Sequence, residues 1–203
     1  RYDSSETLGD LFDLKAPGHM YTRISNPTFA AVEDKLASME GGVGAMLTSS
    51  GQAANLIAIL NIASAGDNFI SLSEIYGGTI NLFAVTLKRL GIEVRFASPS
   101  MSDAEIAAMI NSKTRAVFGE TIANPALKVL DIERFAAIAH TAGIPLIVDN
   151  TFATPVLCRP FEFGADIVVH STTKYLDGHA VAVGGAIVDS GRFDWAASGK
   201  FPE

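Results

Sequence analysis

A lysine, a carboxylate and two hydroxyl groups stand directly after short apolar runs in this sequence. Ser171, Thr173 and Lys174 follow the run 167–169, and Asp149 ends another such run. Ligands of open α/β sheets bind beyond the carboxyl ends of the strands, so groups at these positions can meet in one site. A lysine in dry, partly cationic surroundings becomes a neutral amine, which forms an imine with a carbonyl group. These residue types therefore indicate covalent chemistry on a carbonyl compound.

A loop rich in hydroxyl groups and glycine adds a candidate phosphate site. The segment 48–52 (Thr-Ser-Ser-Gly-Gln) stands directly ahead of an apolar helical run that begins at Ala53. The first N–H groups of a helix have no partner within the helix and lie at the positive end of its dipole, which favours a bound phosphate. The hydroxyl groups of Ser171 and Thr173 can add two donors to this site.

The elements that must position these groups alternate along the chain. The helix-like segments carry start signals, among them a capping box of Ser102 and Glu105 and an N-cap at Asp131. The apolar runs 146–148 and 167–169 lack polar alternation, as expected when helices cover both faces of a sheet. The pattern predicts an α/β domain with one mostly parallel sheet. Its expected strands are 68–72, 93–97, 116–120, 145–149, 166–170 and 185–188.

The combination of groups at this sheet edge is typical of a site for pyridoxal 5'-phosphate (PLP). PLP requires a carboxylate opposite its pyridine nitrogen, because the ring withdraws electrons only as a pyridinium. Asp149, at the end of a buried apolar strand, suits that role. Tyr76 follows another expected strand and can stack on the cofactor ring. Lys174 is then the lysine that holds the cofactor as a Schiff base.

Five segments, which occur in one order along nearly the whole chain, carry a specific resemblance. They are 21–28 (YTRISNPT), 50–53 (SGQA), 120–125 (ETIANP), 148–152 (VDNTF) and 170–176 (HSTTKYL). Together they resemble the Cys/Met-metabolism family of PLP-dependent enzymes, which includes cystathionine γ-synthase, the cystathionine lyases, methionine γ-lyase and O-acetylhomoserine sulfhydrylase. The resemblance implies the large domain of a fold-type I, aspartate-aminotransferase-like PLP enzyme, with helices on both faces of the sheet.

The resemblance also implies a chemical role for four residues. Lys174 forms the internal Schiff base and acts as general base and acid, and Asp149 pairs with the pyridine nitrogen. Tyr76 stacks on the ring and assists proton transfers near the α-amino group. Asn124 lies near the 3-oxygen of the cofactor and the carboxylate of the substrate.

The phosphate, by the same resemblance, is held by backbone and hydroxyl groups. Ser50 belongs to the phosphate loop, and the backbone N–H groups of Gly51 and Gln52 bind the phosphate oxygens. The hydroxyl groups of Ser171 and Thr173 complete the set within one subunit.

The chain divides into an arm and a domain. Residues 1–27 are loop-like and form an N-terminal arm, whose Tyr21 and Arg23 are implied to reach the phosphate of a neighbouring subunit. Residues 28–203 form the PLP-binding large domain. In the family a smaller C-terminal domain supplies the arginine that binds the substrate carboxylate, and we expect that domain to be absent from this chain. The shared site predicts a homo-oligomer, a tetramer built from dimers.

Within the family, the segments 76–83 and 173–179 look most like O-acetylhomoserine sulfhydrylase. Methionine γ-lyases usually have cysteine at the position of Gly78. The sequence thus predicts a transferase of methionine biosynthesis, which replaces the acetate of O-acetylhomoserine by a sulfur nucleophile and yields homocysteine or methionine. The sulfur donor, whether sulfide, a thiol or a sulfur-carrier protein, and the acyl group stay open. Ala180 departs from the family, which often has glycine there.

Other functions stay as alternatives. Within the family these are cystathionine γ-synthase and a cystathionine or methionine γ-lyase. Outside it stands a non-catalytic α/β binding module, because Lys174 and Tyr76 taken singly fit surface and packing roles, and only the complete set favours catalysis.

Composition argues against several other classes. The net charge of −7, without a basic cluster, disfavours nucleic-acid binding. Cys158 is the single cysteine, which excludes an intrachain disulfide and favours a cytoplasmic location. The apolar run 53–63 is shorter than the roughly 20 residues that cross a bilayer, so we expect a buried helix and no membrane partner. No metal site is expected, since His140, His170 and His179 lack ligand spacing.

Overall fold

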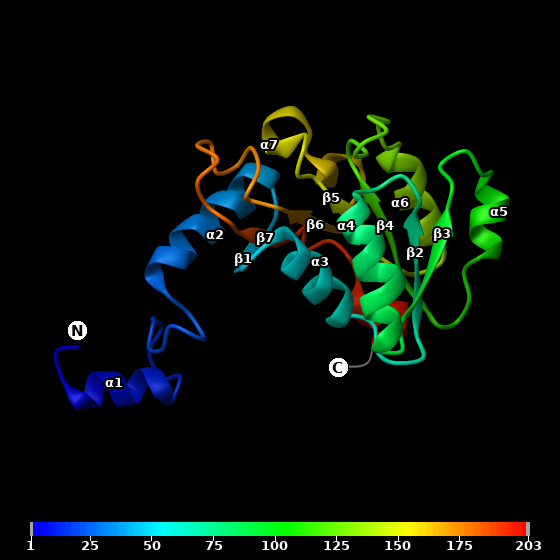
Figure 1. Ribbon diagram of the computed structural model, residues 1–203. Helices are drawn as coiled ribbons and strands as arrows, with labels where there is room; N and C mark the ends of the chain where they lie inside the picture. Colours follow the sequence, from blue (N-terminus) through cyan, green and yellow to red (C-terminus); the bar gives the residue numbers. More distant parts are fainter. Residues whose placement is uncertain (1, 202–203) are drawn as a thin grey trace.

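A single seven-stranded sheet forms the centre of the computed structural model, which describes residues 2–201 (Figure 1). The order of its strands is β1-β7-β6-β5-β4-β2-β3. β7 runs antiparallel to both of its neighbours, and every other pair is parallel. The predicted mostly parallel sheet is thus confirmed. Its strands are β1 (Gly44–Thr48), β2 (Asn68–Leu72), β3 (Glu93–Ala97), β4 (Thr114–Glu120), β5 (Leu146–Asp149), β6 (Ile167–His170) and β7 (Gly185–Asp189).

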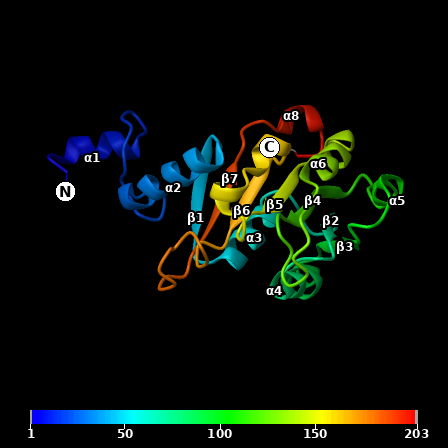
Figure 2. The ribbon, with the colours of Figure 1, turned by 90° about the horizontal axis from the view of Figure 1, so that it is seen from above.

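Helices connect the strands and cover both faces of the sheet (Figures 1 and 2). The capping box of Ser102 and Glu105 and the N-cap at Asp131 are confirmed. The helical elements are α1 (Ser5–Phe12), α2 (Pro27–Glu40), α3 (Gly51–Leu60), α4 (Gly77–Asn81), the π-helical η1 (Leu82–Leu87), α5 (Asp103–Ala108), α6 (Ile132–Thr141), α7 (Thr154–Leu157), the 3-10 helical η2 (Pro160–Phe163) and α8 (Trp195–Ser198). No helix in the described part of the chain has the length and apolar character needed to cross a membrane.

Two buried clusters, one on each face, explain why the central strands lack polar alternation. In β5, Leu146 and Val148 pack with α6 on one face, while Ile147 packs on the other face with α3 and η1. On that second face the rings of Phe69 and Phe118 both meet Phe83 of η1 edge-on, at centroid distances of 4.9 and 5.0 Å. Both faces of each central strand are therefore removed from water, as in other α/β sheets.

The edge strand β1 was not predicted. It lies in the uncharged stretch before the helix α3, and it pairs with β7 in antiparallel register, Gly44 opposite Asp189. Its residues are half-buried or exposed, so the run carries little of the apolar signal that marks the central strands. Only the partner β7, far away in the sequence, makes this segment a strand.

The N-terminal arm differs from its expected form. The expectation of a loop is wrong for Ser5–Phe12, which form the helix α1 with Ser4 as N-cap. Pro27, placed in the arm, is the first residue of α2. Both views show α1 apart from the sheet, beyond the edge strand β1 (Figures 1 and 2). Arg1, Pro202 and Glu203, at the outer bounds of the expected arm and domain, lie outside the described residues.

Candidate active site

The carboxyl ends of β4, β5 and β6 open into a cavity of about 330 Å³. This volume lies within the range of small-molecule sites. Its wall carries every predicted site residue except Tyr21 and Arg23. The lining residues are Ser50, Gly51, Gln52, Asn55, Tyr76, Thr79, Glu120, Ile122, Asn124, Asp149, Thr151, Phe152, Ser171, Thr173 and Lys174.

The start of α3 forms the phosphate-type corner of the cavity. The hydroxyl oxygen of Ser50 accepts a hydrogen bond from the N–H of Ala53 at 3.1 Å, which caps the helix. Ser50 therefore shapes the loop. The N–H groups of Gly51 and Gln52 belong to the first turn, where a helix offers them no carbonyl acceptor. They are available to an anion at the positive end of the α3 dipole.

Glycine at position 51 is a steric requirement. A Cβ atom there would lie 2.5 Å from the Cβ and 2.7 Å from the Cα of Ser171. The helix start thus packs directly on the loop after β6, and the Ser171 side chain stands beside the free N–H groups. The hydroxyl of Thr173, which also lines the cavity, is bonded to the carbonyl and the N–H of Gly184, at 3.1 Å each, and its contact with a phosphate stays a prediction.

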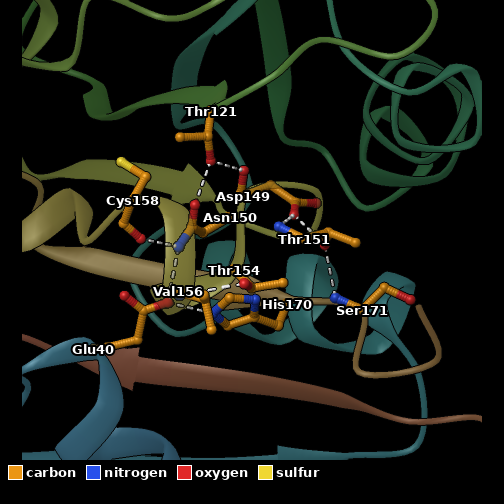
Figure 3. A network of polar contacts seen from close by, with 10 residues as sticks. All are labelled: Glu40, Thr121, Asp149, Asn150, Thr151, Thr154, Val156, Cys158, His170 and Ser171. Carbon is orange, nitrogen blue, oxygen red and sulfur yellow. Dashed lines mark hydrogen bonds and ion pairs between the residues drawn. The ribbon is translucent and has the colours of Figure 1, made fainter. Parts of the chain in front are cut away.

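Asp149 ends β5 at the floor of the cavity. Its Oδ1 accepts hydrogen bonds from both the N–H and the hydroxyl of Thr151, the former at 3.0 Å. The Thr151 hydroxyl oxygen also accepts the N–H of Ser171 at 2.9 Å, which joins the ends of β5 and β6 (Figure 3). Burial raises the pKa of Asp149, whereas the bonds from Thr151 and the charge of the nearby His170 lower it.

Glu120, at the end of β4, joins the two loops on the other side of the cavity. Its Oε1 accepts the N–H of Tyr76 at 2.7 Å, and its Oε2 accepts the N–H of Asn124 at 3.3 Å. Burial and the neighbouring charge of Asp149 raise the pKa of Glu120 to about 7. The sequence places Glu120 after a strand but assigns it no role. The structure shows that it fixes the backbone of two predicted site residues.

Lys174 lies on the turn that follows β6, on an exposed part of the cavity wall. Tyr76 is also half exposed, so the cavity is open to solvent on this side. The loop continues to Ala180, whose φ of 56° lies in the left-handed region that favours glycine. The alanine adopts this backbone at some cost in strain, which a glycine would not have.

The arm residues Tyr21 and Arg23 are not part of the cavity. The Arg23 guanidinium lies 5.2 Å from the centre of the Tyr21 ring, and the Tyr21 side chain is half exposed. Within one chain this part of the predicted site stays separate.

Three further lining residues had no predicted role. Thr79 is buried and accepts hydrogen bonds from Gln52 at 3.0 Å and from Asn55 at 3.4 Å, so it connects α4 with α3. Asn55 Oδ1 is buried without a hydrogen-bond partner in the described residues. Thr151 belongs to the segment 148–152, which carries part of the family resemblance. Its hydroxyl group, two residues after Asp149, was the sequence feature that could have indicated its role.

Comparison with known proteins gives one consistent family. The sequence model described as "Cys/Met metabolism PLP-dependent enzyme" matches residues 1–203. The chain is 47% identical to a homocysteine/cysteine synthase of Kluyveromyces lactis, over 100% of this chain and 46% of that protein. It is 48% identical to O-acetyl-L-homoserine sulfhydrylase 1 of Thermus thermophilus, over 99% of this chain and 48% of that protein.

A solved structure agrees with the same family. A putative O-acetylhomoserine (thiol)-lyase of Campylobacter jejuni, whose crystal structure contains N'-pyridoxyl-lysine-5'-monophosphate, superposes with a TM-score of 0.92 at 36% identity. The match covers 99% of this chain and 50% of that one. The chain thus spans about half the length of the relatives that it matches.

Proposed function

Because the chain belongs to the Cys/Met-metabolism family of PLP-dependent enzymes, we propose that its cavity binds PLP and that the whole protein is an O-acetylhomoserine sulfhydrylase. The proposed reaction replaces the acetate of O-acetylhomoserine by a sulfur nucleophile, which yields homocysteine, or methionine when the nucleophile is methanethiol. The observation that carries the proposal is the meeting of Lys174, Asp149 and the free N–H groups of α3 in one cavity.

The residues of the cavity fit the cofactor. The volume of about 330 Å³ suits a small molecule, Gly51 lets the start of α3 pack directly on Ser171, and Asn55 brings a buried oxygen without a partner in the described residues. We assign the phosphate to the N–H groups of Gly51 and Gln52 and to the loop around Ser50. When bound, PLP supplies an electron sink that stabilises negative charge on substrate carbons.

The chain's own groups then divide the work. The Nζ of Lys174 attaches the cofactor and, once released, takes and returns protons of the substrate carbons as general base and acid. The carboxylate of Asp149, held by Thr151, would pair with the ring nitrogen and keep it protonated. Tyr76 would stack on the ring and assist proton transfers at the amino group, and Asn124 would lie near the 3-oxygen of the cofactor and the substrate carboxylate.

Replacement, in preference to elimination, is supported by the relatives and by one local feature. A side chain at position 78 would overlap the ring of Tyr76, so the Gly78 of this chain sets the position of that ring. The residue usual in methionine γ-lyases, cysteine, would displace it. The names of two relatives, homocysteine synthase and O-acetyl-L-homoserine sulfhydrylase, also support replacement.

We further propose that the active unit is an oligomer that shares sites. Residues 1–27 are proposed as an arm that brings Tyr21 and Arg23 to the phosphate of a neighbouring subunit, and residues 28–203 as the large domain. An apolar groove beside the cavity supports a neighbour: its Leu127, Val156 and Leu157 are more than 70% exposed. A tetramer built from dimers, in the cytoplasm, is the proposed state, with the substrate-carboxylate arginine in a separate C-terminal domain.

An assay of competing substrates tests the function. The PLP-loaded protein is given O-acetylhomoserine with sulfide, and separately cystathionine and methionine, and the products are quantified. We expect homocysteine and acetate to form fastest. Faster turnover of cystathionine or methionine would contradict the proposal in favour of a lyase, and a protein that stays colourless after PLP addition would support a non-catalytic binding module. Replacing sulfide by thiols or a sulfur-carrier protein then identifies the donor.

A further inference from the structure

A buried polar network lies beneath the cavity, and its central pair has no part in the chemistry described above. Glu40, the last residue of α2, meets His170, the last residue of β6 (Figure 3). His170 Nε2 lies 2.6 Å from Glu40 Oε1, and both side chains are 0% exposed. Ionisable groups are rarely buried so completely, because desolvation of a charge is costly unless a partner compensates it.

The network reaches the residues that follow β4 and β5. Asn150, directly after Asp149, donates from Nδ2 to Glu40 Oε1 and to the carbonyl oxygen of Cys158, at 2.9 Å each. The hydroxyl of Thr121 bonds to Asn150 Oδ1 at 2.7 Å and to the carbonyl oxygen of Asp149 at 2.9 Å. Hydrogen bonds thus connect the end of β6 and the residues that follow β4, β5 and α7 to the Glu40 carboxylate, which lies beneath the cavity.

The hydrogen bonds determine which ring nitrogen of His170 carries hydrogen. Glu40 Oε1 accepts from Asn150, and an ionised Glu40 is an acceptor for His170 as well, so Nε2 of the imidazole then carries a hydrogen. Two atoms of the pair stay without a partner in the described residues, Glu40 Oε2 and His170 Nδ1. The carboxylate is therefore under-compensated by neutral donors, and a positive charge on the imidazole would balance it.

A charge on His170 acts on Asp149. The backbone N–H of Asn150 bonds to the carbonyl of Val169 at 3.0 Å, which places the end of β5 beside the end of β6. Burial raises the pKa of Asp149, and the neighbouring His170 lowers it. The other titratable groups near Asp149 and His170 are Glu40 from α2, Cys158 after α7 and Glu120 at the end of β4, whose pKa the charge of Asp149 raises. Lys174 lines the exposed wall of the cavity, and His170 is the basic group of the buried set.

We propose that the Glu40–His170 pair is a positioning unit that holds a buried positive charge beside Asp149, so that Asp149 stays ionised and the proton between it and PLP resides on the ring nitrogen. The inference rests on the proposed PLP site. A purely structural pair would fix the fold of α2 against β6 without affecting that proton, so the two possibilities give different results.

The test compares two variants that remove the charge and keep the hydrogen bonds. Glu40→Gln keeps an acceptor for His170 and Asn150, and His170→Gln keeps a donor toward Glu40. Each full-length protein is loaded with PLP that carries nitrogen-15 in its ring, and the chemical shift of that nitrogen is measured. We expect the unmodified protein to show a pyridinium shift and both variants to move toward neutral pyridine. The PLP dissociation constant should rise about tenfold in each.

Glu33→Gln is the matched control. Glu33 lies on the same helix, and its Oε1 accepts the N–H of Leu47 at 2.8 Å, so its substitution by glutamine removes a half-buried charge and keeps that hydrogen-bond acceptor. It should leave the ring-nitrogen shift and the PLP affinity unchanged. A shift in the control equal to that in the variants would overturn the proposal, since it would show a general loss of packing.

The remaining outcomes also decide the question. If either variant folds, binds PLP and keeps the pyridinium shift, the pair has only a structural role and the inference is wrong, while the proposed function stands. If the unmodified protein binds no PLP, both fail. Because two different substitutions predict one result, failure of one variant to fold leaves the other to decide.

Discussion

Each end of strand β6 carries a contact between a carboxylate and a histidine, but one pair is partly exposed and the other is completely buried. Asp166, just before the strand, meets His140 at 2.8 Å, and the side chain of that histidine is 44% exposed. His170, at the other end, meets Glu40 at 2.6 Å, and both side chains are completely buried. Asp166 Oδ2 also accepts the N–H of Leu146 at 2.8 Å, so it organises the entry of the chain into the sheet.

The difference shows which end of a parallel sheet can form a binding site. At the amino end the His140 side chain is partly exposed and Asp166 is bonded to the N–H of Leu146 at the start of β5, which fits a structural role. At the carboxyl end the loops after β4, β5 and β6 converge with the free N–H groups of α3, and the buried pair lies beneath them. Substitutions at the carboxyl end should therefore change cofactor chemistry, and those at the amino end should change stability.

Lys174→Ala should have the largest effect, at the carboxyl end. It removes the amine proposed to attach the cofactor and to move protons, so turnover should fall by at least about 10³-fold. Borohydride treatment of the PLP-loaded protein followed by mass spectrometry should show no covalent adduct, although PLP still binds through its phosphate. Lys128→Ala, which removes an exposed lysine paired with Glu74, is the control. A persistent adduct in the Lys174→Ala protein would refute the assignment of Lys174.

Asp149→Asn should follow in size. The amide can still accept the N–H of Thr151, so the fold is retained, but the charge opposite the ring nitrogen is lost. We expect kcat to fall about 10²-fold, because charge stabilisation of this kind typically has that magnitude. Asp189→Asn is the control. Asp189 is the last residue of the antiparallel strand β7 and lies at the amino ends of the parallel strands, away from the cavity, so kcat should be unchanged. Equal activity of the two variants would remove the distinction between the ends of the sheet.

The stability of the PLP-free protein should fall as the pH rises, because the buried Glu120 loses its proton. Its pKa is raised from 4.5 to about 7, so between these values the folded state binds more protons than the unfolded state. The free energy of unfolding therefore falls as the pH rises through this window, by at most about 3 kcal/mol from this group. Glu120→Gln should flatten the profile, as measured by urea unfolding at several pH values. An unchanged slope would show that Glu120 is ionised throughout.

Asp166→Asn should have the smallest effect, at the amino end. The amide oxygen can still accept the N–H of Leu146, and the loss of charge toward the exposed His140 should cost about 1 kcal/mol of unfolding free energy. Thermal unfolding measures this change, and PLP affinity should be unaltered. A large loss of PLP affinity would mean that the amino end also controls the site.

The local sequence pattern predicts much of the secondary structure. Six of the seven strands, the capping box at Ser102 and the N-cap at Asp131 were predictable, because buried runs and caps depend on neighbours in the sequence. Strand β1 was not, since its identity depends on pairing with β7. α1 was expected as a loop, although Ser4 caps it and Leu8, Leu11 and Phe12 stand at helical spacing, because the proline and glycine that follow it favour a loop for the whole segment.

For the site, the sequence by itself determined which chemical groups stand after the strands: Lys174, Asp149, and the loop that ends in Ser50-Gly51-Gln52. Strand ends are local features, and a parallel sheet brings them to one edge. The tertiary structure alone decided how they are supported. Glu120 holding Tyr76, and Glu40 lying against His170, join residues far apart in the chain. No local preference encodes such contacts, because only the packing of α2 on the sheet and the pairing of β4 with β2 bring these carboxylates to their partners.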